Sequence, residues 1–317
     1  MIEKPLIIVS LVTSFFGFSA ENYNQKIADF YNRDSYSKAE AESIGPAPPE
    51  LQNLPIVSSA TKPAINAKFY ALIDYETGAA LIEKKSTEKT PIASTTKIMT
   101  AIVALENYNL DDVVTISEKA AYQPGADAYL RVGEKITVSE LLHCMLIKSG
   151  NDSAYALAEF MDKSDIPTIE SFVDKMNIKA EEFGLSNSNF RDPAGLDVSG
   201  YSTAADMAQI TRYALQNATF RKIVSTSDYV ATSVDKTAYH QLHNSNRLVA
   251  EYQYPGAIGV KTGFMPEASH SLVGAATRNG HTLIAAVYYT YADTATASAD
   301  ETKKLLDWGF EYTKWDD

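Results

Sequence analysis

The stretch from residue 91 to 103, PIASTTKIMTAIV, constrains this chain more than any other, because it sets a lysine inside an almost continuous apolar run. Apolar or small residues follow Lys97 on nearly every helical face, which is typical of a helix surrounded by protein. Ser94 lies three residues before Lys97, so the two side chains share one face of such a helix. Burial lowers the pKa of a lysine, and a neutral amine at Lys97 would accept the hydroxyl proton of Ser94. The pattern predicts an activated serine nucleophile, with the alternative that Ser94 is an N-cap and Lys97 a surface lysine.

Size and charge limit the classes of function. The chain has 317 residues, of which 45% are hydrophobic, and this is enough for a large core in one or two domains. The formal net charge of -12 argues against a nucleic-acid partner and favours a small or cationic substrate. The single cysteine, Cys144, excludes an internal disulfide, and its apolar surroundings predict a buried, unreactive thiol.

The first 19 residues predict an export signal. Lys4 precedes an apolar core from Leu6 to Phe16, and small residues follow in a small-x-small arrangement. Glu3 offsets the charge of Lys4, so retention as a membrane anchor stays open. Either outcome places the rest of the chain outside the cytoplasm, as a secreted, periplasmic or wall-facing protein. Residues 20–63 are polar and then proline-dense, which predicts a linker that packs little.

The folded domain is predicted over residues 64–312, with residues 313–317 as a tail. Strands are expected at both of its ends, first as a hairpin around Gly78 and later around Asn279-Gly280, a strong turn signal. The expected strands cover residues 69–74, 79–83, 257–264, 271–277 and 282–290, and a closing helix covers about 300–312. Residues from about 94 to 250 have helical periodicity instead. We therefore predict an α/β fold of the α+β type, an antiparallel sheet built from both termini with an inserted helical lobe.

Within the lobe, Thr137 and Glu140 form a capping-box pattern that opens a helix ending at Ser149-Gly150. A new helix follows Asn151, so the junction is a tight turn between two buried helices. Such a turn can present the Ser149 hydroxyl for proton relay and the Asn151 amide for bonding a substrate backbone. The alternative is that Ser149 and Asn151 only satisfy helix ends. Further helices are expected over 169–183, ended by Gly184, and from Thr203 to Leu215.

Lys261-Thr262-Gly263 lies on one of the later predicted strands. A strand edge offers backbone hydrogen bonds to an extended peptide, and Lys261 adds positive charge. The Thr262 hydroxyl can bond a terminal carboxylate, and Gly263 removes a side chain that would obstruct the peptide. The tripeptide alone carries little information, whereas three such motifs in order are specific.

Ser94-Thr95-Thr96-Lys97, Ser149-Gly150-Asn151 and Lys261-Thr262-Gly263 are the S-x-x-K, S-x-N and K-T-G elements of penicillin-recognising serine enzymes. The chain resembles, more narrowly, the low-molecular-weight penicillin-binding proteins that act as D-alanyl-D-alanine carboxypeptidases. The likeness covers about residues 64–312, and it extends to DPAGLD at 192–197 and to Tyr201-Ser202-Thr203-Ala204.

This resemblance implies a β-lactamase/transpeptidase-like fold and removal of the terminal D-alanine from peptidoglycan stem peptides through an acyl-enzyme, without metal or cofactor. It makes Ser94 the nucleophile, Lys97 its base and Ser149 part of the catalytic set. It makes Asn151 and the Lys261-Thr262-Gly263 tripeptide substrate-binding. The backbone N–H groups of Ser94 and Phe264 would form the oxyanion hole, and β-lactams would acylate Ser94.

The chain departs from the family pattern in one respect that bears on substrate binding. Members often carry a carboxylate-binding arginine before the final helix, yet no arginine follows Arg278. Carboxylate binding is then expected to depend on Thr262 and Lys261. Many relatives also continue into a β-rich domain and a membrane tail, whereas this sequence ends with the predicted catalytic domain.

Three other functions stay open at this point. A class A-like β-lactamase needs a glutamate to activate the deacylating water, and Glu182 is a partial match that we interpret as solvated. A D,D-endopeptidase acting on cross-links would use the same residues, and a wall-binding module without activity is disfavoured by the intact motifs. A metal hydrolase is set aside, because His240-x-x-His243 lacks a partner glutamate motif and both histidines are expected to be structural or exposed.

Overall fold

A five-stranded antiparallel sheet lies at the centre of the computed structural model, which describes residues 54–58, 61–164 and 166–315. The strand order is β3-β2-β10-β9-β8. The beginning of the chain supplies two strands and its end supplies three: β2 (Ala67–Asp74), β3 (Ala80–Lys84), β8 (Ala257–Met265), β9 (Ser269–Arg278) and β10 (His281–Thr290). The sheet is therefore built from both ends of the domain, as the sequence predicts, and β8 is one of its edges.

Both faces of the sheet are buried. Along β2, Phe69 and Ile73 belong to the core shared with the lobe, whereas Tyr70 and Leu72 pack in the core beneath α11 (Ala297–Tyr312). Successive side chains of a strand point to opposite faces, so a sheet covered twice needs apolar residues at every position. The unbroken apolar run of β10 follows from this arrangement.

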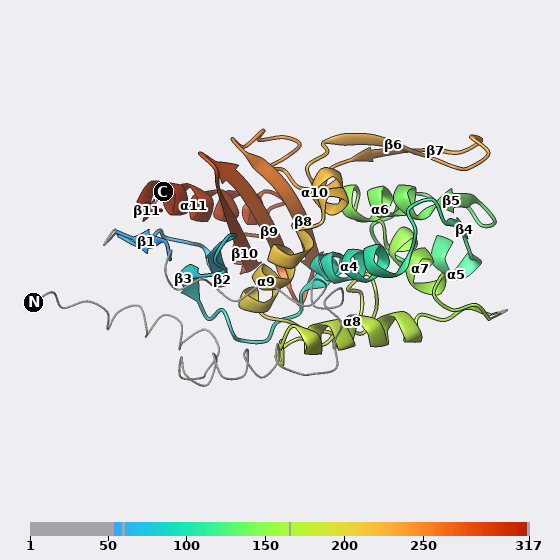
Figure 1. Cartoon of the computed structure of the whole chain (residues 1–317), viewed down its shortest axis with the longest axis horizontal. Helices are drawn as coiled ribbons and strands as arrows, with labels where there is room; N and C mark the ends of the chain where they lie inside the picture. Colours follow the sequence, from blue (N-terminus) through green and yellow to red (C-terminus); the bar gives the residue numbers. More distant parts are fainter. Residues whose placement is uncertain (1–53, 59–60, 165, 316–317) are drawn as a thin grey trace, which may run out of the picture.

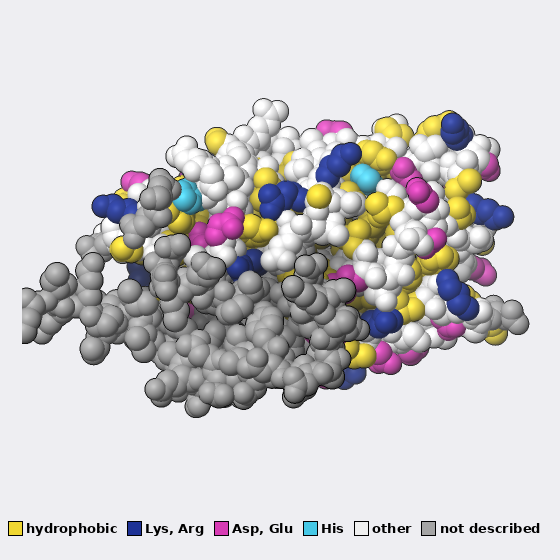
Figure 2. Space-filling model, in the orientation of Figure 1, with side chains coloured by type: hydrophobic (Ala, Val, Ile, Leu, Met, Phe, Trp, Pro, Cys, Tyr) yellow, Lys and Arg dark blue, Asp and Glu magenta, His cyan; other side chains and the backbone are white. Residues whose placement is uncertain are grey.

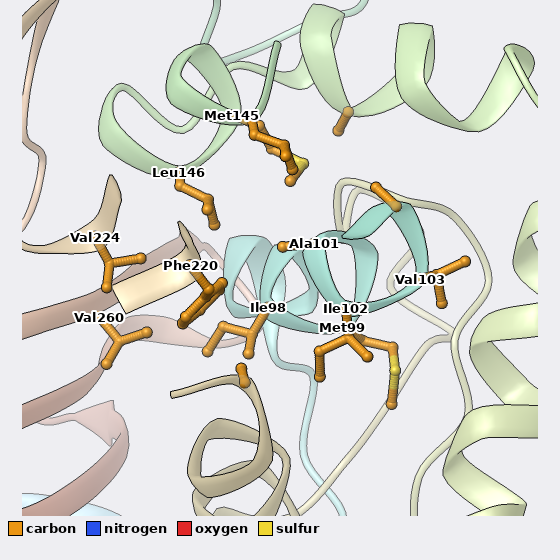
Figure 3. Close-up of a cluster of buried hydrophobic side chains, with 14 of the residues drawn as sticks. Ile98, Met99, Ala101, Ile102, Val103, Met145, Leu146, Phe220, Val224 and Val260 are labelled. Carbon is orange, nitrogen blue, oxygen red and sulfur yellow. The ribbon is translucent and has the colours of Figure 1, made fainter. Parts of the chain in front are cut away.

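Helices of the inserted lobe surround α4 (Lys97–Asn107), the helix that follows Ser94 (Figure 1). Figure 3 shows Ile98 and its neighbours on α4 among side chains of α6, α10 and β8, such as Leu146, Phe220 and Val260. The full burial of Ile98 confirms the predicted buried helix. The other helices of this part are α5 (Glu118–Ala121), α6 (Val138–Ile147), α7 (Asn151–Glu159), α8 (Glu170–Glu182), α9 (Ala204–Ala214) and α10 (Ala218–Val224).

Two small hairpins interrupt the lobe, and here the expectation of helix from 94 to 250 is wrong. β4 (Val113–Thr115) pairs with β5 (Lys135–Thr137), and β6 (Asp228–Thr232) pairs with β7 (Tyr239–His243). Each strand has only three to five residues, and the exposed positions include apolar side chains such as Val113 and Val230. Runs this short carry almost no periodic signal, so only tertiary pairing reveals them.

Helix ends follow local chemistry. The Thr137 hydroxyl accepts a hydrogen bond from the Glu140 N–H, and Gly184 has the left-handed φ of +71° expected of a helix C-cap. The Glu140 carboxylate, however, accepts from the Tyr229 hydroxyl at 2.9 Å and from the Thr232 N–H at 3.2 Å. The capping box is thus half formed, because this carboxylate holds the β6–β7 hairpin instead.

The folded unit extends beyond both predicted boundaries. β1 (Ile56–Val57), in the predicted linker, pairs with β11 (Thr313–Lys314), in the predicted tail. The export signal over residues 1–19 lies outside the described residues. Within the described ranges, no helix is long and apolar enough to cross a bilayer. On the face shown in Figure 2, basic and acidic side chains are interspersed over the described surface.

Candidate active site

Ser94 lies in a short 3₁₀ turn, η2 (Ala93–Thr96), which leads directly into α4. Lys97 Nζ donates a hydrogen bond to Ser94 Oγ at 2.9 Å. Lys97 is fully buried, and neither η2 nor α4 has a side-chain cap. Both parts of the alternative, a capping Ser94 and a surface Lys97, therefore disagree with the structure.

Lys97 is held by three polar partners in an otherwise apolar setting. Besides Ser94, its Nζ donates to Asn151 Oδ1 at 2.7 Å and to the Ala194 carbonyl at 2.9 Å. Burial lowers the pKa of Lys97 to about 7, although the charges of Asp192 and Asp152 act in the opposite direction. The ammonium and the neutral amine are then both accessible near neutrality, as a general base requires.

Ser149 joins α6 to α7 in a left-handed conformation, with φ of +69°. This backbone, uncommon for a serine, directs its hydroxyl toward β8, where Lys261 Nζ donates to Ser149 Oγ at 2.8 Å. Lys261 is fully buried, and its pKa lies well below the usual value because of burial and then of the Lys97 charge. The structure thus forms two lysine–serine hydrogen-bonded pairs, Lys97 with Ser94 and Lys261 with Ser149, and the pKa of both lysines is lowered.

Asn151 is the first residue of α7, and its amide is engaged at both ends. Its Oδ1 accepts from Lys97, and its Nδ2 donates to the Pro124 carbonyl at 2.6 Å. The Asn151 N–H also donates to the Ala126 carbonyl at 2.7 Å. One N–H of the side-chain amide therefore remains for a substrate backbone, and the loop containing Pro124 and Ala126 fixes where it points.

The edge strand β8 brings Lys261, Thr262 and Gly263 against the nucleophile turn. A Cβ on Gly263 would lie 3.1 Å from the Ile92 carbonyl oxygen and 3.3 Å from Thr95 Cγ2. The missing side chain thus faces the η2 turn, rather than the substrate side that the sequence suggested. Glycine permits this approach of β8 to η2. The oxyanion hole formed by the N–H groups of Ser94 and Phe264 stays a prediction.

Thr262 is half-buried at the end of this group. Its Oγ1 lies 2.8 Å from Ser245 Oγ, and Lys261 Nζ donates to the Thr262 carbonyl at 3.0 Å. Ser245 belongs to the loop before β8, where Arg247 Nε also donates to the Ala295 carbonyl at 3.1 Å. An arginine side chain therefore lies next to Ala295, just before the final helix α11, although it comes from another part of the sequence than the family pattern indicates.

The carboxylates near Ser94 are engaged in structural bonds. Asp192 accepts hydrogen bonds from four successive backbone N–H groups, those of residues 194–197, at 2.7 to 2.9 Å. Glu182, the candidate of the β-lactamase reading, instead forms an ion pair with Lys179 at 2.8 Å at the end of α8. Both carboxylates are therefore engaged in structural contacts.

Asp152 and Ser245 are neighbours of the site that sequence reasoning missed. Buried Asp152 accepts from the Ala128 and Leu130 N–H groups at 3.0 and 3.1 Å, and so anchors the loop that holds Asn151. Its place directly after Ser149-Gly150-Asn151 was a usable signal, since an acid at a buried helix start needs donors. Nothing in the sequence marks Ser245, whose partner lies 17 residues away.

The remaining candidates have structural surroundings. His240 is buried between Glu134 and the Ala128 carbonyl, whereas His243 is exposed beside Asp228. Among the described residues, no group of three or more His, Cys, Asp or Glu side chains is arranged to hold a metal. Cys144 is fully buried, and burial raises the pKa of its thiol well above the usual value.

Comparison with known proteins agrees with this geometry. The sequence model of the D-alanyl-D-alanine carboxypeptidase family, peptidase family S11, matches residues 56–290. The chain belongs to this family. It is thus a serine peptidase of the penicillin-binding kind, with the predicted β-lactamase/transpeptidase-like fold.

Two bacterial relatives show the extent of the likeness. The chain is 39% identical to D-alanyl-D-alanine carboxypeptidase DacF of Bacillus subtilis over 254 residues, which are 78% of this chain and 63% of that protein. It is 38% identical to the D-alanyl-D-alanine carboxypeptidase of Streptomyces sp. strain K15, covering 80% of this chain and 90% of the relative. The crystal structure of the Streptomyces K15 DD-transpeptidase superposes with a TM-score of 0.74 at 38% identity, covering 80% of this chain and all of that one. The chain therefore spans less than two thirds of DacF but nearly the whole Streptomyces enzyme.

Proposed function

We propose that this chain is a serine-type D-alanyl-D-alanine carboxypeptidase that removes the terminal D-alanine from peptidoglycan stem peptides. The observation that carries the proposal is the 2.9 Å bond between Ser94 Oγ and a buried Lys97 whose pKa is about 7. A neutral lysine amine beside a serine hydroxyl is the activated nucleophile that acyl transfer requires.

The reaction follows from the positions of these groups. Lys97 in its neutral form takes the proton from Ser94 as Oγ attacks the carbonyl between the two D-alanines. The N–H groups of Ser94 and Phe264 stabilise the oxyanion. Collapse of the tetrahedral intermediate breaks the peptide bond, and the proton that Lys97 took passes through the Ser149 hydroxyl, which Lys261 bonds at 2.8 Å, to the departing D-alanine amine. Lys97 is then neutral again. Water attacks the acyl-enzyme as Lys97 accepts its proton, and Lys97 returns that proton to Ser94 Oγ as the ester bond breaks and the shortened peptide leaves.

The substrate is proposed to lie along the free edge of β8 as an added strand. Its terminal carboxylate would meet the Thr262 hydroxyl, and the Asn151 side-chain amide would bond its backbone from the lobe side. Lys261, Thr262 and Gly263 thus act as substrate-binding residues. β-Lactams would enter the same place and acylate Ser94. No metal or cofactor takes part in these steps.

Release of D-alanine tests the proposal. The full-length protein should release D-alanine from a pentapeptide ending in D-alanyl-D-alanine and should be labelled covalently by a fluorescent penicillin. Ser94→Ala should abolish both while the fold is retained, because it removes the attacking atom and little volume. Penicillin labelling that survives in Ser94→Ala would show that the nucleophile is another residue.

A second outcome is D,D-endopeptidase or transpeptidase activity, because the acyl-enzyme is common to all three reactions and only the leaving or accepting amine differs. The Streptomyces relative is described both as a carboxypeptidase and as a transpeptidase. Incubation with a cross-linked dimer, and separately with an added amine acceptor, distinguishes the three by their products. The β-lactamase alternative predicts rapid turnover of penicillin, whereas the engaged Asp192 and Glu182 favour a stable adduct.

We further propose that the catalytic part acts outside the cytoplasm, delivered by the signal predicted over residues 1–19. Whether this segment is cleaved or stays as an anchor is decided by sequencing the N-terminus of the protein recovered from its native host. A mature chain that begins near residue 20 supports cleavage. An intact start in the membrane fraction supports an anchor, and protein found in the cytosol contradicts the proposal.

A further inference from the structure

Tyr288 is a tyrosine on β10 whose hydroxyl contacts the nucleophile turn η2 from within the core. The hydroxyl oxygen lies 2.9 Å from Thr95 Oγ1, and Thr95 is the residue directly after Ser94. The two residues are 193 positions apart in the sequence, and both side chains are fully buried. The proposed reaction steps use neither hydroxyl. The pair is therefore a buried polar contact beside Ser94 that the chemistry so far leaves unexplained.

The direction of this hydrogen bond follows from the number of protons available. Thr95 Oγ1 donates its single proton to the Ile92 carbonyl, at a distance of 2.6 Å. Toward Tyr288 it can then only accept, so the Tyr288 hydroxyl is the donor. Burial raises the pKa of Tyr288, although the bond with Thr95 acts in the opposite direction, and the hydroxyl keeps its proton at neutral pH. The two bonds thus run in one direction, from Tyr288 through Thr95 to Ile92.

These two bonds close a tight turn with an uncommon backbone. Ala93 has φ of +47°, a left-handed conformation that few residues other than glycine adopt. Ile92 and Thr95 flank Ala93 and Ser94, so the bond between their carbonyl and hydroxyl groups holds the two ends of the turn together. Tyr288 fixes the Thr95 hydroxyl in the rotamer that makes this bond. A turn with such a conformation needs its surroundings to maintain it.

Thr95 fits between two strands of the sheet. Its hydroxyl contacts Tyr288 on β10, and its Cγ2 would lie 3.3 Å from a Cβ on Gly263 of β8. Because Thr95 directly follows Ser94, the sheet acts on the nucleophile through this one side chain. The result is the observed distance of 2.9 Å between Ser94 Oγ and Lys97 Nζ.

Building on the proposed function, we propose that Tyr288 is a positioning residue for the nucleophile: its hydroxyl, acting through Thr95, holds the Ser94 hydroxyl and N–H where acylation requires them. A nucleophile that is displaced by a fraction of an ångström reacts more slowly, even when the substrate is still bound. Tyr288 is fully buried and cannot touch the substrate. Within the described residues, it also makes no hydrogen bond to Asn151 or Thr262, which are proposed to bind the substrate. It should therefore affect the rate of bond formation and not the binding step.

Acylation by benzylpenicillin separates these two effects. Stopped-flow measurement on the full-length protein over a range of penicillin concentrations gives both the limiting rate constant and the half-saturating concentration. Tyr288→Phe keeps the ring and removes only the hydroxyl. It should lower the limiting rate constant about threefold to tenfold, the range for one hydrogen bond, and leave the half-saturating concentration within about twofold.

Tyr108→Phe is the matched control, because Tyr108 makes the same kind of bond at the other end of α4. Its hydroxyl donates to the Leu157 carbonyl at 2.9 Å. The helix has 11 residues, so its two ends are about 16 Å apart. Both substitutions should lower Tm, but only Tyr288→Phe should lower the limiting rate constant. A general loss of stability would therefore not produce the expected result.

Substitutions of Thr95 test whether Tyr288 acts through this residue. Thr95→Ser keeps the hydroxyl and should retain the limiting rate constant within about threefold, whereas Thr95→Val removes both bonds and should lower it by about tenfold or more. In the Thr95→Val background, Tyr288→Phe should cause no further loss, because the tyrosine hydroxyl then has no partner. If Tyr288→Phe does not fold, the two Thr95 variants decide, and equal limiting rate constants for them would overturn the proposal.

Other outcomes would also overturn it. An unchanged limiting rate constant in Tyr288→Phe, together with a lower Tm, would make Tyr288 a structural residue only. A raised half-saturating concentration alone would assign it to substrate binding, and additive losses in the Thr95→Val/Tyr288→Phe double variant would exclude the route through Thr95. The proposed function is tested separately on the unchanged protein: absence of both penicillin acylation and D-alanine release would overturn that function.

Discussion

The protonation state of Lys97 determines whether this residue can act as the general base for Ser94. With a pKa of about 7, set mainly by burial, it loses its proton as the pH rises through neutrality, and only the neutral amine can take the Ser94 proton. The rate of acylation by benzylpenicillin should therefore rise about tenfold per pH unit below pH 7 and level off above it. Stopped-flow measurement of acylation from pH 5 to 9 checks this, and a rate that is flat across pH 7 would exclude Lys97 as the base.

Replacing Lys97 by arginine tests the same role without removing the charge. A guanidinium stays protonated at every accessible pH, so Lys97→Arg should slow acylation by at least about 10³-fold. Circular dichroism should show that the variant is folded. Near-normal acylation in this variant would assign the base to another group.

Thr262 is the residue that we expect to hold the substrate carboxylate. Thr262→Val should weaken cleavage of the D-alanyl-D-alanine peptide by about 1.5 to 3 kcal/mol, the range for a hydrogen bond to a charged group. Ser245 Oγ lies 2.8 Å from the Thr262 hydroxyl, so Ser245→Ala is the informative companion. On the same peptide ending in an amide instead of a carboxylate, Thr262→Val should not weaken cleavage. A silent Thr262→Val would mean that another group, with Arg247 the nearest candidate, already binds the carboxylate.

At the scale of elements, the β6–β7 hairpin holds the loop that orients Asn151. His240 Nε2 lies 2.7 Å from Glu134 Oε1, and its Nδ1 lies 2.9 Å from the Ala128 carbonyl oxygen. Both side chains of the pair are 4% exposed. The Glu134 bond is the main cause that raises the pKa of His240, while burial opposes it and the Asp152 charge adds to it. Asn151 therefore depends on a contact between two elements that the sequence did not reveal.

Because the folded pKa of His240 lies above its unfolded value, the pair stabilises the protein fully below the unfolded pKa of about 6.5. This stabilisation is lost as the pH rises through the folded pKa. Glu134→Gln should thus lower the free energy of unfolding by about 1.5 to 3 kcal/mol at pH 6 and by less at pH 9. Urea unfolding at the two pH values measures the difference. An equal loss of unfolding free energy in Glu134→Gln at pH 6 and at pH 9 would show that the pair of His240 and Glu134 is not charged.

A structural feature could be predicted from the sequence when the residues that form it are close together along the chain. The Thr137 cap, the Gly184 C-cap and the Asn279-Gly280 turn depend on neighbours within four residues, so local rules suffice for them. The bonds from Glu140 to Tyr229 and from Ser245 to Thr262 join distant segments, and no periodicity encodes them. The three motifs could be recognised, yet their meeting point required the sheet and the lobe to be assembled.

At the scale of the whole molecule, the two ends of the domain hold each other. β1 pairs with β11, Trp308 Nε1 donates to the Thr61 carbonyl at 3.1 Å, and Trp315 Nε1 donates to Asp74 Oδ2 at 2.9 Å. The sheet is built from the same two ends, so these bonds close the fold at the place where its first and last strands enter. Residues 54–58 and 61–63 therefore belong to the folded unit.

A chain that begins at residue 64 should be less stable than one that begins at residue 54. It loses β1, the Ser58 N–H bond to the Tyr312 carbonyl at 2.9 Å, and the Thr61 acceptor of Trp308. At about 0.5 to 1.5 kcal/mol for each bond, and about 2 to 4 °C per kcal/mol for a domain of this size, Tm should fall by at least about 4 °C. Penicillin acylation at 25 °C should be unchanged, because residues 54–58 and 61–63 form no hydrogen bond with Ser94, Lys97 or Lys261 in the part of the chain that the structure describes. Calorimetry measures Tm for the two chains. Equal Tm values would show that the segment before residue 64 does not stabilise the domain and acts as a linker.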